Sequence, residues 1–130
     1  MKKNNINNKN KLHCLIVEDN IQAAEILAIF FKRNGISFET AENGETGLKM
    51  YLENPLKYNL IFLDLEMPVM NGYEMAKRIR ESDMPMSNKI PIIVMSGTYT
   101  NVESEEGLFN YFIKKPFKIS CLINIINEVI

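Results

Sequence analysis

The sequence predicts an α/β fold, a doubly wound parallel sheet within a single domain. Two observations carry this prediction. Short apolar runs, too brief for helices, recur along the chain, and segments with apolar residues at helical spacing stand between them. The chain has 130 residues, 46% of them hydrophobic, which suffices for one core and leaves no room for a second domain.

The first two strand and helix units occupy the amino-terminal half. The apolar run 12–17 predicts a buried strand, and a helical pattern follows it until Asn34-Gly35, a good left-handed terminator. Residues 36–41 mix apolar and polar side chains, as a half-exposed edge strand does. A short second helix then ends at Asn54-Pro55.

Three further strands are predicted in the remaining chain. Residues 60–63 form an apolar run that ends in Asp64, and helical spacing resumes after the turn MPVMNG. Residues 91–95 and 111–113 give two more strands. The closing helix shows an apolar stripe at Leu122, Ile125, Ile126 and Val129. The segment from Thr98 to Gly107 is hard to assign.

Five strands that alternate with helices imply right-handed crossovers and a flavodoxin-like (βα)5 sheet of order 2-1-3-4-5. In such sheets the functional crevice lies outside the carboxyl ends of the strands, at the switch point between strands 1 and 3. The first and third strands are followed here by acidic residues, so this rule places a candidate site on the sequence.

Polar residues follow four of the predicted strands. Glu18 and Asp19 follow the first, Asp64 the third, Ser96 the fourth and Lys115 the fifth. A single strand-end Asp is often a turn residue or helix cap, but the joint placement favours a shared site. Three nearby carboxylates repel one another and need a cation, and Mg²⁺ prefers such oxygen ligands. The sequence therefore predicts a magnesium site.

This set of residues suits phosphoryl transfer to a carboxylate. Asp64 is the candidate nucleophile, since a metal and Lys115 can neutralise charge on the transferring group. The hydroxyl of Ser96 can hydrogen-bond phosphoryl oxygens, and Gly97 beside it leaves the approach open. An aspartyl phosphate at Asp64 is the expected product.

The motifs LIVEDN, FLDLEMPVMNG, IPIIVMSG and KKPF, in this order, resemble those of the response-regulator receiver domain, and the resemblance covers residues 12–130. It implies that Asp64 is the phospho-acceptor. It implies a Mg²⁺ site formed by Glu18, Asp19, Asp64 and the main-chain carbonyl of Glu66. Glu18, in place of the usual Asp, acts mainly through a bound water.

The resemblance also implies the remaining roles. Ser96 and Lys115 contact the phosphoryl group, and Phe112, where Tyr is frequent, changes rotamer on activation together with a shift of Ser96. Asn71 and Gly97 replace a common Asp and Ala. The spacing from Ser96 to Lys115 is about three residues shorter than usual, which affects the helix expected there and the usual output surface. The peptide bond before Pro116 is often cis in the family.

The implied function is a receiver that is phosphorylated by a histidine kinase or a histidine phosphotransfer protein. Its motif sequences most resemble those of receivers associated with hybrid kinases. Such a domain is not an enzyme beyond its own phosphorylation and dephosphorylation. It acts through a downstream protein partner, as a monomer or a phosphorylation-dependent dimer. Two alternatives stay open: a pseudo-receiver that binds partners without phosphorylation, and a phosphohydrolase, which release of phosphate from p-nitrophenyl phosphate would reveal.

Composition narrows the setting. The net charge of −1 gives no field that favours nucleic acid or a membrane surface, so neither is an expected partner. With no secretory signal or spanning run, a cytoplasmic protein is expected. Cys14 and Cys121 are interpreted as small core residues. The Asn- and Lys-rich residues 1–11 are expected to form a flexible tail.

Overall fold

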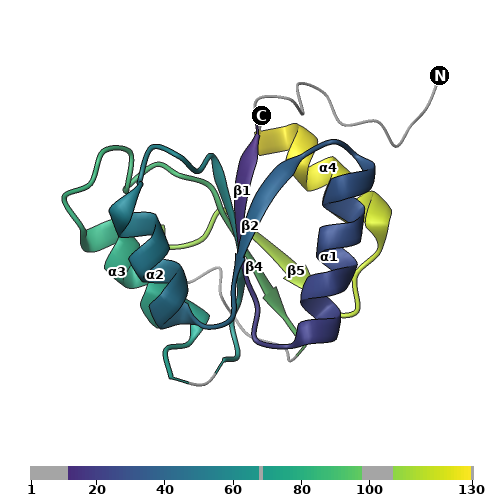
Figure 1. Ribbon diagram of the computed structural model, residues 1–130, viewed down its shortest axis with the longest axis horizontal. Helices are drawn as coiled ribbons and strands as arrows, with labels where there is room; N and C mark the ends of the chain where they lie inside the picture. Colours follow the sequence, from purple (N-terminus) through teal and green to yellow (C-terminus); the bar gives the residue numbers. More distant parts are fainter. Residues whose placement is uncertain (1–11, 68, 98–106, 130) are drawn as a thin grey trace.

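The computed structural model describes residues 12–67, 69–97 and 107–129, which form a five-stranded sheet with helices on both faces (Figure 1). Every strand pairing is parallel, and the strand order is β2-β1-β3-β4-β5, as predicted. The strands are β1 (His13–Val17), β2 (Ser37–Ala41), β3 (Leu60–Asp64), β4 (Ile92–Ser96) and β5 (Tyr111–Lys114). The helices within these ranges are α1 (Ile21–Arg33), α2 (Gly44–Glu53), α3 (Gly72–Glu81) and α4 (Ile119–Val129).

Two apolar clusters fill the space between the sheet and its helices. Helices α1 and α4 lie against one face, and α2 and α3 against the other (Figure 1). The central strands β3 and β4 are buried along their whole length, because helices cover both of their faces. The edge strand β2 is mostly half-exposed, as its mixed sequence predicts. The sheet therefore holds the residues at the carboxyl ends of its strands in a packed framework.

Three asparagines start helices at the carboxyl edge of the sheet. The side chains of Asn20, Asn43 and Asn71 each accept a hydrogen bond from a backbone N–H in the first turn of α1, α2 and α3. At the other end of α1, Gly35 adopts a φ of 70°, as the predicted left-handed terminator requires. The amino termini of these three helices consequently lie at the carboxyl edge of the sheet.

Two glycines pack directly against backbone carbonyls at the two ends of the loop between β3 and α3. A Cβ at Gly72 would lie 2.3 Å from the carbonyl oxygen of Asp64, and one at Gly44 would lie 2.3 Å from that of Met70. The Gly72 N–H also donates to the carbonyl of Leu65 at 3.1 Å. Only glycine allows both approaches, so these two residues fix the loop that follows the candidate acceptor.

The structure corrects one interpretation and leaves others untested. Cys14 is buried as predicted, but Cys121 is exposed on α4, because it lies off the apolar stripe of that helix. The predicted tail at 1–11 and nearly all of the segment 98–107, where a fifth helix was expected, lie outside the described residues. No helix within the described ranges is both long enough and apolar enough to cross a bilayer.

Candidate functional site

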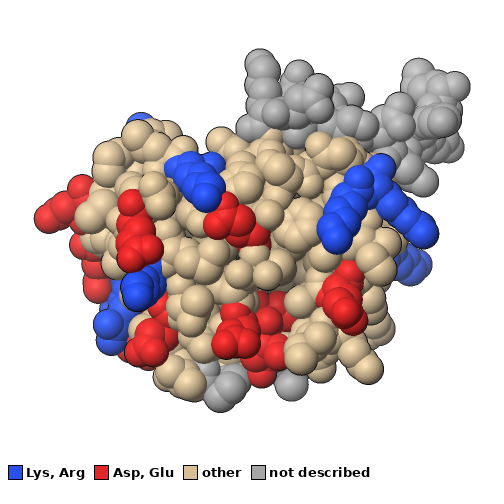
Figure 2. All heavy atoms as spheres, viewed as in Figure 1, with Lys and Arg blue, Asp and Glu red and all other residues tan. Residues whose placement is uncertain are grey.

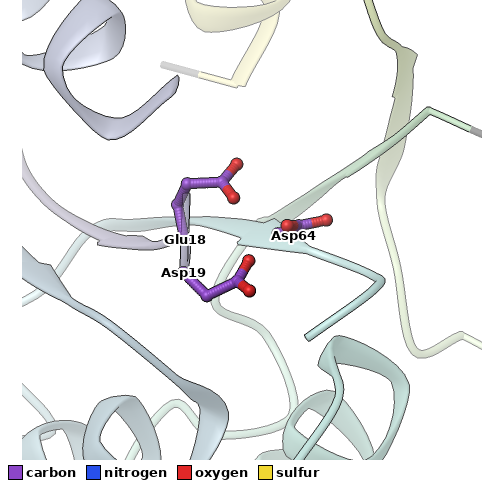
Figure 3. Close-up of side chains that lie close together, drawn as sticks. All are labelled: Glu18, Asp19 and Asp64. Atoms are coloured by element: carbon purple, nitrogen blue, oxygen red, sulfur yellow. The ribbon is translucent and has the colours of Figure 1, made fainter. Parts of the chain in front are cut away.

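Three carboxylates converge at the switch point of the sheet. Glu18 and Asp19 follow β1, and Asp64 ends the neighbouring strand β3, since Val17 pairs with Leu63. One oxygen from each carboxylate lies within 4.8 Å of the others (Figure 3). The side chains of Glu18 and Asp64 are only 1% and 5% exposed, whereas Asp19 is exposed. The sequence prediction that these acids meet is confirmed.

Lys115 reaches the same point from the far side of β4. It follows β5, and its Nζ lies 2.7 Å from Oε1 of Glu18 and 3.5 Å from Oδ2 of Asp64. Its backbone N–H donates to the carbonyl of Ser96 at 2.7 Å, and the bond to Pro116 is cis. The preceding residue, Lys114, is exposed.

The two buried carboxyls titrate differently. Burial, then the hydrogen bond and charge of Glu18, raises the pKa of Asp64 to about 7. Burial also opposes ionisation of Glu18, but hydrogen bonds from Asp64, Lys115 and the Asn20 N–H outweigh it and lower the pKa of Glu18. Burial works against the charge of Lys115 too, yet its bonds to the acids raise its pKa. The site brings together three carboxylates and one ammonium, so its negative charge is only partly compensated.

Ser96 and Glu66 lie in contact beside Asp64. Ser96 is fully buried at the end of β4, and its hydroxyl donates to Oε2 of Glu66. The Gly97 N–H donates to Oε1 of Glu66 at 3.3 Å, and the Glu66 N–H donates to Oδ1 of Asp64 at 3.1 Å. The side chain of Glu66 thus belongs to the site, whereas sequence reasoning assigned a role only to its carbonyl. The signal was available, because Glu66 stands two residues after Asp64 on the same rim.

Phe112 lies in β5, where it packs, half-buried, against the apolar cluster under α2 and α3. Its register partner is Val94, two residues before Ser96 at the rim. The structure thus places Phe112 on the strand next to that of Ser96, and its predicted rotamer change stays a prediction.

A cleft of about 800 Å³ opens over these residues. Its lining includes Glu18, Asp19, Asp64, Glu66 and Lys115. Figure 2 shows acidic side chains gathered along the lower edge, where the strands end. Beside the cleft lies an apolar groove of about 480 Å³, lined by Ala23, Ile26, Gly97, Lys115, Pro116 and Phe117. The groove adjoins the cleft, since Ala23, Ile26, Gly97 and Lys115 line both.

The cluster fits a hard metal ion. It offers three carboxylate oxygens, which are ligands that hard cations prefer over softer nitrogen or sulfur donors. The pKa of Asp64, which burial and then the hydrogen bond and charge of Glu18 raise, points in the same direction, because a nearby cation would favour the ionised carboxylate.

Comparison with known proteins agrees with this geometry. The sequence pattern of the response regulator receiver domain matches residues 14–127. The chain is 36% identical over 113 residues to the osmolarity two-component system protein SSK1 of Saccharomyces cerevisiae, covering 86% of this chain and 15% of that protein. It is 31% identical over 122 residues to two-component response regulator 24 of Arabidopsis thaliana, covering 93% and 86%.

A solved structure is similar as well. The receiver domain of Saccharomyces cerevisiae Ssk1, crystallised with the histidine phosphotransfer signaling protein Ypd1, superposes with a TM-score of 0.77 at 27% identity, covering 91% of this chain and 88% of that one. The chain spans 15–20% of the length of the first two curated relatives it matches and most of the length of the Arabidopsis regulator. Because the family pattern matches residues 14–127, this chain belongs to the response regulator receiver domain family.

Proposed function

We propose that this chain accepts a phosphoryl group on Asp64 from a phosphohistidine of a histidine kinase or histidine phosphotransfer protein, with Mg²⁺ bound at the acidic cluster. The observation that carries the proposal is the meeting of Glu18, Asp19 and Asp64 with Lys115 in one open cleft. The yeast receiver crystallised with a histidine phosphotransfer protein supports the class of donor.

In the reaction, a carboxylate oxygen of Asp64 forms a bond to phosphorus while the bond from phosphorus to the donor's histidine nitrogen breaks. The leaving imidazole keeps the electron pair of that bond. Mg²⁺, held by Glu18, Asp19, Asp64 and the carbonyl of Glu66, would neutralise charge on the phosphoryl oxygens. The Lys115 ammonium lies 3.5 Å from Asp64 and would form an ion pair with those oxygens after transfer.

The output is a change of conformation around the new phosphoryl group. Phosphorylation exchanges one negative charge for about −1.5 to −2 and adds acceptor oxygens. The Ser96 hydroxyl turns toward them and draws the end of β4 inward, and Phe112 changes rotamer on the neighbouring strand. Such a population shift needs only a few kcal/mol of differential interaction, and a downstream protein partner reads it.

The apolar groove next to the cleft is the surface on which the donor docks. It combines the exposed side chain of Ile26 on α1 with the chain after Lys115, directly beside the acceptor. A donor protein must bring its histidine to Asp64, and the groove supports this contact because it shares Ala23, Ile26, Gly97 and Lys115 with the lining of the cleft that holds Asp64. Apolar lining suits a protein partner rather than a small anionic donor.

The first experiment is intact mass after incubation with acetyl phosphate and Mg²⁺. Wild type should gain about 80 Da, one PO₃ unit, in an adduct labile to hydroxylamine, and Asp64→Asn should not. No adduct with excess Mg²⁺, and no binding of a beryllofluoride mimic, would overturn the proposal. That result would favour the alternative, a binding module that works without phosphorylation.

A second experiment tests the groove. Ile26→Asp should slow transfer from a phosphohistidine protein about tenfold or more while leaving labelling by acetyl phosphate unchanged. Leu56→Asp is the matched control, since Leu56 is equally an exposed apolar residue but lies before β3, at the opposite edge of the sheet. Equal slowing in both variants would exclude the groove as the docking surface.

A further inference from the structure

We infer that the Glu66 side chain acts as an internal anion that occupies the phosphoryl-binding donors of the resting site and so sets how readily Asp64 accepts a phosphoryl group. The inference rests on the proposed function and deepens it. It concerns the side-chain carboxylate of Glu66, which is separate from the main-chain carbonyl expected to face the metal.

Two donors among the described residues hold the carboxylate of Glu66. Oε2 accepts from the Ser96 hydroxyl, and Oε1 accepts from the Gly97 N–H at 3.3 Å. Two successive residues at the end of β4 thus present a hydroxyl and an amide to one anion. This is the pair of donors that stands beside Asp64, where the oxygens of a phosphoryl group would lie.

The two anions cannot use these donors together. A serine hydroxyl has one proton to donate, and a backbone amide also has one. The Ser96 hydroxyl already donates its proton to Glu66, so it cannot turn to a new acceptor without releasing the carboxylate. A phosphoryl oxygen that takes either donor therefore displaces an oxygen of Glu66, and the like charges of the two groups add to the competition.

The displacement needs movement of a side chain only. The Glu66 N–H donates to Oδ1 of Asp64 at 3.1 Å, which fastens the backbone of Glu66 to the acceptor. The residue as a whole is exposed, so its carboxylate can swing into solvent and be hydrated there. The Glu66 carboxylate can thus be displaced. Its hydrogen bonds with Ser96 and Gly97 must be broken whenever a phosphoryl group or mimic binds these donors.

The substitution Glu66→Gln tests this directly, because it removes the charge and keeps the shape. A neutral amide oxygen accepts more weakly from Ser96 and Gly97 than a carboxylate does. Glu42→Gln is the matched control: Glu42 is an exposed acid that follows β2 at the same edge of the sheet. Both variants change the net charge by one unit, but only the first touches the donors.

The measurement is a titration with beryllofluoride at saturating Mg²⁺. We expect Glu66→Gln to bind the mimic about tenfold more tightly than wild type, the order of one hydrogen bond to a charged group, and Glu42→Gln to bind it as wild type does. In the metal-free protein, the amide resonance of Gly97 should shift in Glu66→Gln and stay in place in Glu42→Gln. Mg²⁺ affinity, titrated alone, should change less than twofold in either variant.

Three outcomes would overturn the inference. The mimic could bind Glu66→Gln no more tightly than wild type. Both variants could gain equally, which would make the effect one of net charge. Glu66→Gln could lose Mg²⁺ affinity, which would place the carboxylate on the metal. If wild type and both variants all fail to bind the mimic, the proposed function itself fails, and the inference falls with it.

Discussion

Lys115 donates a 2.7 Å hydrogen bond to the Glu18 carboxylate, although the two residues stand 97 positions apart in the chain. The same ammonium lies 3.5 Å from Asp64. One ammonium thus lies near two almost fully buried carboxylates, and it comes from a strand end that lies two strands away from β3. The charge balance of the crevice depends on this long-range contact.

Replacing Lys115 with Met should lower the free energy of unfolding of the metal-free protein by about 3 kcal/mol, because a buried charge loses its partner. Urea denaturation measures this loss, and Mg²⁺ should recover most of it. Lys114→Met is the control, since Lys114 is exposed one residue earlier. Equal losses in the two variants would contradict a compensating role for Lys115.

Asp64→Asn should stabilise the metal-free protein at pH 8. Burial and Glu18 raise the pKa of Asp64 to about 7 from an ordinary value near 3.8, so folding favours the protonated acid. The stability linked to that proton is present below the ordinary value and is lost as pH rises through about 7. Thermal melting should show the variant roughly 5 °C above wild type at pH 8.

The difference should shrink toward pH 5, where Asp64 is already protonated in the folded chain, and also on addition of Mg²⁺ at pH 8. Asp83→Asn serves as control, because Asp83 is exposed and lies after α3. A gain for Asp64→Asn that is constant from pH 5 to pH 8 would show that Asp64 does not titrate in this window.

Arg80→Met should destabilise the fold by about 3 kcal/mol. The guanidinium of Arg80, on α3, donates to the carbonyls of Ser87, Ile90 and Leu108 at 2.8 to 3.2 Å and also to the side chain of Asn110. Removing it leaves several acceptors without this donor. Chemical denaturation gives the loss.

The matched control for that variant is Arg78→Met on the same helix. Arg78 makes an exposed pair with Glu74 one turn away, and such pairs contribute about 0.5 kcal/mol or less. Comparable losses at both positions would mean that the acceptors around Arg80 find water instead.

Gly72→Ala should cost about 2 kcal/mol or more, because its Cβ would lie 2.3 Å from the Asp64 carbonyl oxygen, and backbone must move to admit it. Gly97→Ala should be close to neutral, since no described atom lies within 4 Å of the added Cβ. Differential scanning calorimetry of both variants separates them. A neutral Gly72→Ala would show that the loop before α3 yields.

The order of the sheet and most of the site could be predicted from sequence. Parallel strands carry their carboxyl ends to one edge, so Asp64 and Lys115 had to approach each other once the strands were recognised. Periodicity located each described helix for a similar reason, because burial of one face repeats along it. These features follow from short patterns and from one topological rule.

What escaped prediction depends on side-chain direction. The carboxylate of Glu66 turns toward Ser96, and no sequence pattern specifies that rotamer. The sequence pattern around Arg80 is that of a solvent-exposed helix residue. In the structure, its guanidinium donates to carbonyls of two separate loops, which no local pattern specifies. Cys121 falls among apolar neighbours in the sequence but faces solvent, because a helix turns it about 100° away from Leu122.

The backbone packs closely on one side of Asp64, in the loop after β3, and loosely on the other, at the end of β4. Toward α2 and α3, the backbone of Asp64 and Met70 presses against Gly72 and Gly44 and leaves no space to move. Toward β4, Gly97 meets no such wall among the described residues. If Asp64 accepts a phosphoryl group as proposed, we therefore expect the resulting displacement to be larger at the end of β4 than in the loop before α3.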